Sequence, residues 1–246
     1  MRVRNFQQQW ARLRGALQKL RARVPLGGER VWPAAANDLF VAHESIYRFF
    51  AGFADRRRIL DAGCGLGYGS DRLAAAGARE VLGIDLEAAS LRYASRNYRR
   101  PNLRFEIQDL EKLDLPQASF DLVVSSNAME HLRSPERFLR AASRALAPGG
   151  EMLLAVPPIT NEHLLADNQA NPHHLSNLTV DEWLQLFQRL GLAAHLYRHG
   201  HPQIEELDFS SHLPSRFAAD EFTFVEVSPR RFAEKASLTA VFRLQV

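Results

Sequence analysis

The chain has 246 residues, a hydrophobic fraction of 46% and a formal net charge of +3 at neutral pH. This length suits one domain with appendages, and no apolar run approaches the roughly 18 residues that a membrane span requires. The single cysteine, Cys64, excludes an internal disulfide and a cysteine-rich metal cluster, so we expect a reducing, cytoplasmic location.

The first predicted element is a basic amphipathic helix over residues 6–24, where apolar residues recur every three or four positions. Residues 1–30 hold eight Lys or Arg and one Glu, a net charge of +7, which leaves −4 for residues 31–246. Such a helix suits peripheral contact with the inner face of a membrane, but it equally suits dimerisation or packing on the rest of the chain. A mitochondrial presequence is a minor alternative. The acidic remainder argues against a nucleic-acid partner.

A short helix is predicted over residues 43–50, and a buried strand follows at 58–61. The strand runs into a turn with glycines at positions 63, 65 and 67, which leads into a helix over 68–77. Because glycine has no Cβ, this turn can take positive φ angles and lie close against a ligand. The turn is therefore the first candidate for a binding site.

The next strand, 81–85, ends in Asp85, the position at which a doubly wound sheet holds the ribose of a nucleotide cofactor. Two cofactor families share this layout, and the spacing of the glycines separates them. The dinucleotide fingerprint G-x-G-x-x-G would need its third glycine at Tyr68 or Ser70. A nicotinamide-dependent oxidoreductase is therefore disfavoured.

Strands and helices alternate along the rest of the chain, which is typical of an α/β fold with a parallel sheet. A helix over 179–190 opens with Thr179 as a candidate cap and ends at Gly191. The segment 200–235 is rich in Pro, His and Ser, and we expect it to be irregular. Further strands are predicted at 103–109, 120–126, 151–156, 193–199 and 237–245, and further helices at 87–98 and 134–146.

Five segments, in the family's order, resemble motifs of class I S-adenosylmethionine-dependent methyltransferases. The turn that follows Asp61 is similar to the first motif of that family, an acidic residue followed by G-x-G-x-G. The resemblance implies a Rossmann-like, doubly wound, seven-stranded sheet with a reversed last strand, formed by residues 31–246, and S-adenosyl-L-methionine as the cofactor. The matching segments are 59–70, 81–87, 103–110, 120–132 and 144–150.

The resemblance also assigns residues to the cofactor. Asp85 would hold the ribose hydroxyls, and Asp109 would contact the adenine amino group, although Glu106 and Glu111 compete for that place. Asp61 would hold the glycine turn or reach the methionine amino group through water. Tyr47 is either an ordinary half-buried aromatic or a cofactor neighbour. The expected set is Tyr47, Asp61, Gly63, Gly65, Gly67, Asp85, Leu86, Asp109, Leu110 and Asn127.

A methyl acceptor with a reacting oxygen must lose a proton, and a histidine with a pKa near neutrality suits that task. His131, which follows the fourth strand, is either a positioning residue or the base. Asn171-Pro172-His173-His174 resembles the N-P-x-H segment of a bacterial subgroup that modifies surface saccharides, and we favour His174 as the base. Other histidines later in the chain could be metal ligands. Mg²⁺, however, prefers oxygen ligands, and no array of carboxylates is evident. No metal site is therefore predicted.

The sequence therefore predicts methyl transfer from S-adenosylmethionine to a small-molecule acceptor, with a hydroxyl of a sugar or glycolipid favoured. A quinone-like or other small lipid is the alternative acceptor. A methyltransferase-like protein that binds without catalysis is a third hypothesis. Residues 1–30 are expected to form the basic helix and a linker, and 200–235 to lie near the acceptor side.

Overall fold

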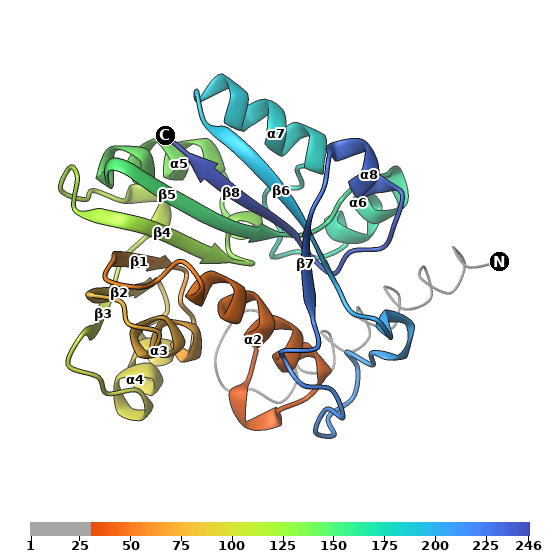
Figure 1. Ribbon diagram of the computed structural model, residues 1–246, viewed down its shortest axis with the longest axis horizontal. Coiled ribbons are helices and arrows are strands. Elements are labelled where there is room, and N and C mark those ends of the chain that lie inside the picture. The colour runs from red at the N-terminus through yellow and green to blue at the C-terminus, as the bar shows by residue number, and fades with distance from the viewer. Residues whose placement is uncertain (1–30) are drawn as a thin grey trace.

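The computed structural model describes residues 31–246, so the helix predicted over residues 6–24 lies outside the described residues. The described part contains an eight-stranded sheet with the order β3-β2-β1-β4-β5-β8-β6-β7 (Figure 1). The strands are β1 (Arg58–Ala62), β2 (Glu80–Asp85), β3 (Leu103–Ile107), β4 (Phe120–Ser126), β5 (Leu146–Val156), β6 (Ala193–Gly200), β7 (Thr223–Glu226) and β8 (Ala240–Gln245). The α-helices are α2 (Asp38–Ala51), α3 (Tyr68–Ala75), α4 (Ala88–Asn97), α5 (Pro135–Ala145), α6 (Glu162–Gln169), α7 (Val180–Arg189) and α8 (Pro229–Ala233), and the 3-10 helices are η1 (Pro33–Ala35), η2 (Leu110–Lys112), η3 (Met129–His131) and η4 (Ile204–Glu206).

The sheet has the expected Rossmann-like topology. Strands β1 to β5 pair in parallel, so their carboxyl ends lie on one edge, and β8 runs antiparallel to β5 as the predicted reversed last strand. The predicted number of seven strands is too low, because β7 pairs with β6 at the edge of the sheet. This strand lies within 200–235, which was predicted to be irregular. Three of its four residues are exposed, Val225 among them, so this edge strand contributes no fully buried side chain to the core.

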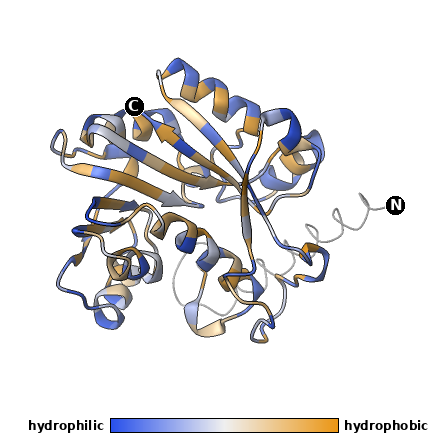
Figure 2. Ribbon diagram, in the orientation of Figure 1, coloured by the Kyte–Doolittle hydropathy of each residue, from blue (hydrophilic) through white to orange (hydrophobic). Residues whose placement is uncertain are grey.

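Apolar side chains cover both faces of the sheet. On one face, α2 and α3 contribute Ile46, Phe50 and Leu73, and on the other, α5 and α7 contribute Phe138 and Trp183. Burying such a side chain stabilises the fold by about 1.5–3 kcal/mol. Hydrophobic residues follow the central strands, whereas α7 alternates between hydrophobic and hydrophilic turns (Figure 2). Across residues 31–246, no helix combines the length and apolar character needed to cross a bilayer.

Two helices differ in how clearly the sequence marks them. The predicted α7 begins with a capping box, in which Thr179 Oγ1 accepts from the Glu182 N–H at 3.2 Å and the Glu182 carboxylate accepts from the Thr179 N–H at 2.8 Å. By contrast, α6 was not predicted. Its buried residues, Asp167 and Asn168, are polar and therefore leave no apolar stripe.

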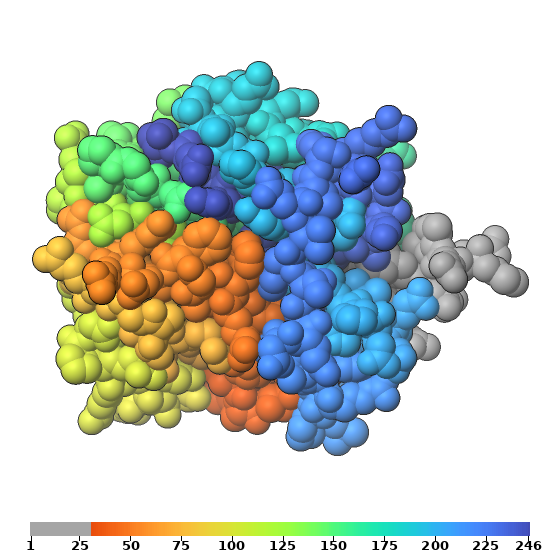
Figure 3. All heavy atoms as spheres, in the orientation of Figure 1, coloured from red at the N-terminus to blue at the C-terminus, as the bar shows by residue number. Residues whose placement is uncertain are grey.

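The segment between β6 and β7 packs against α2 (Figure 3). Its backbone is tied to the start of that helix, since the Asp208 N–H donates to the Asp38 carboxylate and the Ser215 N–H donates to the Ala36 carbonyl, both at 2.7 Å. The apolar cluster between the segment and the helix includes Val41, Ala42, Leu207, Phe217 and Phe222. These contacts hold the first half of α2 against the segment.

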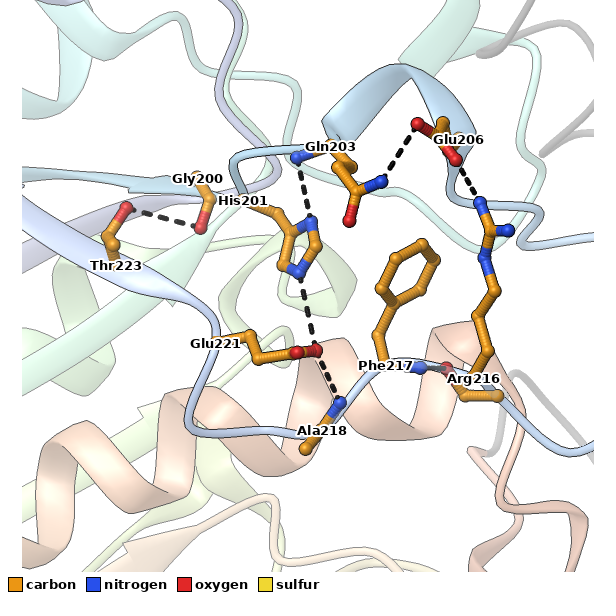
Figure 4. Close-up of polar contacts among 10 residues, drawn as sticks. Gly200, His201, Gln203, Glu206, Arg216, Phe217, Ala218, Glu221 and Thr223 are labelled. Carbon is orange, nitrogen blue, oxygen red and sulfur yellow. Dashed lines mark hydrogen bonds and ion pairs between the residues drawn. The ribbon is translucent and has the colours of Figure 1, made fainter.

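His201 connects the two ends of this segment (Figure 4). Its Nδ1 accepts from the Gln203 N–H at 3.1 Å, and its Nε2 lies 3.7 Å from the Glu221 carboxylate. The imidazole also packs against the ring of Phe217, with the centroids 4.7 Å apart. The part of 200–235 that precedes β7 is thus a packed connection built on a buried histidine.

Candidate active site

A cavity of about 390 Å³ opens at the carboxyl edge of the sheet, where β1, β2 and β4 end. This is the edge at which open α/β sheets bind their ligands. The wall brings together most of the predicted site residues from five separate segments. Those that line it are Tyr47, Gly63, Gly65, Asp85, Leu86, Asp109, Leu110, Asn127 and His131.

The carboxylate of Asp85 is held by the backbone around it. Its Oδ2 accepts from the Gly65 N–H and its Oδ1 accepts from the Glu87 N–H, both at 2.9 Å. The residue is only 6% exposed, and its exposed part faces the cavity. Two backbone donors therefore orient this carboxylate before any ligand binds, which suits it to accept hydrogen bonds from a pair of hydroxyls.

Two glycines of the turn have different physical roles. Gly65 has a φ of +54°, and a Cβ added there would meet nothing within 4 Å, so its backbone faces open space. Gly67 has a φ of +82°, and a Cβ there would lie 2.6 Å from the Cβ of Ala94. Gly67 does not line the cavity, although it was predicted to bind the cofactor. A glycine is needed at this position because α3 begins there, close to Ala94 on α4.

Asp61, which was predicted to hold the glycine turn or to reach the methionine amino group through water, does not itself line the cavity. Its carboxylate is fully buried and accepts from the Tyr47 hydroxyl at 3.1 Å and the Ser70 hydroxyl at 2.5 Å. Burial raises the pKa of Asp61 to about 7, against the two hydrogen bonds, which lower it. Tyr47, which is hydrogen-bonded to Asp61, does line the cavity.

The third strand ends earlier than predicted, at Ile107, and of the three competing acids Asp109 lines the cavity whereas Glu106 and Glu111 do not. Asp109 caps η2 by accepting from the Glu111 N–H at 3.0 Å, and it lines the cavity. Glu106 lies on β3, and its exposed side chain pairs with that of Arg104 on the same strand. Asp109 is therefore the acid at the position expected for the adenine contact.

The two candidate bases, His131 and His174, lie side by side, with their ring centroids 5.2 Å apart. His131 lines the cavity, and its Nδ1 lies 3.0 Å from the carbonyl of His173. His173 also lines the cavity, whereas His174, the favoured base, does not. The Nδ1 of His174 instead lies 2.6 Å from Oδ1 of Asn168 on α6.

The further wall residues that were not assigned from the sequence include His43, Tyr68 and Ser126. His43 precedes Tyr47 by four residues on α2, so both share one helix face, and this spacing is a signal that could have found it. Neither lysine nor arginine lines the cavity in the described part of the chain. The wall thus offers carboxylates, imidazoles and apolar groups, and no cationic side chain that a phosphate would need.

Comparison with known proteins agrees with this geometry. A family model described as a methyltransferase domain matches residues 60–154. A probable S-adenosylmethionine-dependent methyltransferase from Mycolicibacterium smegmatis is 36% identical over 68% of this chain and 65% of its own length. A ubiquinone biosynthesis O-methyltransferase from Bordetella avium is 37% identical over 41% of this chain and 42% of its own length.

A solved structure has the same fold, that of an S-adenosylmethionine-dependent methyltransferase from Mesorhizobium loti. It matches with a TM-score of 0.60 at 22% identity and covers 83% of this chain and 98% of that one. The chain spans 65% of the mycobacterial relative, so part of that relative has no counterpart in the alignment. The motifs, the fold and the sequence matches agree, and the chain belongs to the class I S-adenosylmethionine-dependent methyltransferases, whose cofactor is S-adenosylmethionine.

Proposed function

We propose that this protein transfers the methyl group of S-adenosylmethionine to an oxygen atom of a small-molecule acceptor. The observation that carries the proposal is a single cavity whose wall holds both the carboxylates of Asp85 and Asp109 and the imidazoles of His131 and His173. Such a cavity can hold a nucleoside and an acceptor together, which is what direct group transfer requires.

The residues present fit the cofactor. Asp85 is oriented to accept from ribose hydroxyls, Asp109 lies within the same wall, and the open space above Gly65 admits a ligand against the backbone. When bound, the cofactor supplies a methyl group already activated on a sulfonium. Tyr47 and Asn127 would contact the rest of the nucleoside, since both line the cavity.

On the acceptor side, His131 is the better placed of the two predicted bases. Because a carbonyl can only accept, the contact with His173 implies that Nδ1 of His131 carries the proton and that Nε2 carries the lone pair. This lone pair can accept the proton of an acceptor hydroxyl. His174, which contacts the ring of His131 and lies outside the wall, would position His131.

The favoured acceptor is a hydroxyl of a sugar or glycolipid. A wall without lysine or arginine among the described residues does not favour a nucleic acid, whose phosphates are bound by such side chains. The similarity to a ubiquinone biosynthesis O-methyltransferase supports oxygen as the acceptor atom and keeps a quinone-like lipid as the alternative. Contact with a membrane or a second copy through residues 6–24 stays a prediction.

The experiment is transfer of radiolabelled methyl groups from S-adenosylmethionine to separated saccharide, lipid and RNA fractions. The proposal predicts label in the saccharide or glycolipid fraction, and loss of that label with His131→Ala. Label in the quinone-containing lipid fraction would support the alternative acceptor. Label confined to RNA would contradict the proposal, as would equal labelling by wild type and His131→Ala.

A further inference from the structure

The sequence predicted no metal site, but the fold brings three metal-ligating side chains together beside the cavity, which one of them, His131, lines. Glu130 and His131 belong to η3, and His174 comes from the loop that follows α6. One ligand atom from each of the three lies within 4.8 Å of the others. We propose that Glu130, His131 and His174 bind a divalent transition-metal ion.

Hydrogen bonds orient His131 for this role. Its Nδ1 lies 3.0 Å from the carbonyl oxygen of His173, which can only accept, so this nitrogen carries the ring proton. The lone pair of the neutral ring is then on Nε2. Metal-bound histidines characteristically donate their other ring N–H to a carbonyl or carboxylate in this way.

The same pattern holds for His174. Its Nδ1 lies 2.6 Å from Oδ1 of Asn168, while the Nδ2 of Asn168 donates to Oδ1 of Asn177 at 2.7 Å. Asn177 in turn donates to the carbonyl of His174 at 3.2 Å. This chain of amides fixes Oδ1 of Asn168 as an acceptor, so Nδ1 of His174 is the donor and Nε2 is the ligand atom.

The backbone holds the two segments of the site in register. The N–H groups of Leu175 and Ser176 donate to the carbonyl of Glu130 at 2.8 Å and 3.0 Å. Glu130 is only 4% exposed, so its carboxylate is held by the fold beside the two rings. These side-chain and backbone hydrogen bonds therefore hold the three ligands in place, unlike side chains that are free on a protein surface.

Two imidazoles and one carboxylate suit Zn²⁺, Fe²⁺, Mn²⁺ or Co²⁺, because Mg²⁺ prefers a shell of oxygen ligands. Three protein ligands leave coordination positions open. Since His131 lines the cavity, an open position can face the acceptor. An acceptor hydroxyl held there would lose its proton to water more readily. Its oxygen would then form a bond to the methyl carbon as the methyl–sulfur bond of S-adenosylmethionine breaks, and S-adenosylhomocysteine would leave with that electron pair.

This role in methyl transfer rests on the proposed function, whereas the ion-binding site rests on the side-chain geometry alone. With an ion bound, Nε2 of His131 is a ligand, and the ion takes over the task of lowering the acceptor's pKa. His131 would then act through the ion and not as the base itself.

The test is titration of chelator-treated full-length protein with Co²⁺, followed by its visible absorption, together with the zinc content after gel filtration. Wild type is expected to bind one ion per chain, and His174→Ala to bind at least about tenfold more weakly. Asn168→Ala should weaken binding about 10- to 100-fold through the ring orientation alone. His195→Ala is the matched control, because exposed His195 pairs with the Glu226 carboxylate at 2.8 Å outside the site.

Binding of S-adenosylhomocysteine by each variant shows whether it is folded and separates the two proposals. If the cofactor analogue binds but Co²⁺ binds wild type no more tightly than His174→Ala, the metal site is refuted and the three side chains form only a hydrogen-bonded cluster. If Co²⁺ binds as expected but the cofactor analogue does not, the metal site stands and the proposed function fails.

Discussion

The hydroxyl of Tyr47 on α2 donates a 3.1 Å hydrogen bond to the carboxylate of Asp61 on β1, beneath the glycine-rich turn. The second oxygen of that carboxylate accepts from Ser70 on α3, so Asp61 joins three elements. Asp61 thus supports the cavity wall through Tyr47, which has one side in the core and one side on the cavity.

Removing the hydroxyl with Tyr47→Phe should destabilise the protein by about 1–3 kcal/mol, because a buried acceptor loses its donor. S-adenosylhomocysteine should also bind more weakly, since the ring would no longer be held against the wall. Urea denaturation and calorimetry measure the two effects. Tyr98→Phe, at the partly exposed end of α4, is the control, and equal behaviour of both variants would contradict the bridging role of Tyr47.

The raised pKa of Asp61 predicts a pH dependence of stability. The native state keeps the proton of this carboxyl up to a pKa of about 7, whereas the unfolded state loses it near pH 4. Between these values the native state binds more protons, so this group makes stability fall by about 1.4 kcal/mol per pH unit as pH rises. Asp61→Asn should remove this slope. Urea denaturation from pH 5 to pH 8 tests it, and parallel curves for both proteins would refute it.

His199 should act in the opposite direction at lower pH. Its buried ring contacts Ser45 at 2.8 Å and Thr239 at 3.0 Å, and burial, with His43 and His201 nearby, lowers its pKa to about 3. The unfolded state, with a pKa near 6.5, binds the extra proton first, so stability falls as pH drops from about 6.5 towards 3. His199→Gln should therefore show a shallower loss of stability in acid. An unchanged acid transition would show that His199 does not titrate as described.

The two glycines of the turn should respond differently to alanine. Gly67→Ala combines a positive φ with a Cβ 2.6 Å from Ala94, so it should lower stability by more than the roughly 1–3 kcal/mol of the backbone strain. Gly65→Ala carries the strain without the clash, and its methyl group points into open space. It should mainly weaken S-adenosylhomocysteine binding. Thermal unfolding and calorimetry separate the two, and the reverse order of stabilities would contradict this assignment.

The elements that the sequence predicted are those with a regular apolar pattern. Strands β1, β2 and β4 are nearly continuous buried runs, β3 alternates apolar and charged residues, and α7 has both an apolar stripe and a capping box. Of the missed elements, β7 is an exposed edge strand inside a segment rich in Pro, His and Ser, and α6 buries polar residues. Local periodicity cannot report an element whose position depends on partners distant in the sequence.

The site residues also divide into those that a local sequence pattern predicts and those whose position depends on the fold. Asp85 was predicted from a strand end and a fixed distance to the glycine turn, and it lines the cavity. His173 and His174 were assigned less well, because they are adjacent in a loop and the direction of each side chain depends on how the loop folds. The grouping of Glu130 with His174 depends on the backbone hydrogen bonds from Leu175 and Ser176, which no local pattern reveals.

The central claim is that the cavity beside Asp85 binds the cofactor, and calorimetric titration with S-adenosylhomocysteine tests it most directly. The control is Asp55→Ala, because Asp55 is an exposed acid that precedes β1, at the sheet edge opposite the cavity. The account predicts micromolar binding by wild type and Asp55→Ala, and binding at least about tenfold weaker by Asp85→Ala, which loses charge-assisted hydrogen bonds worth about 1.5–3 kcal/mol each. Equal binding by all three folded proteins, or no binding by folded wild type, would contradict it.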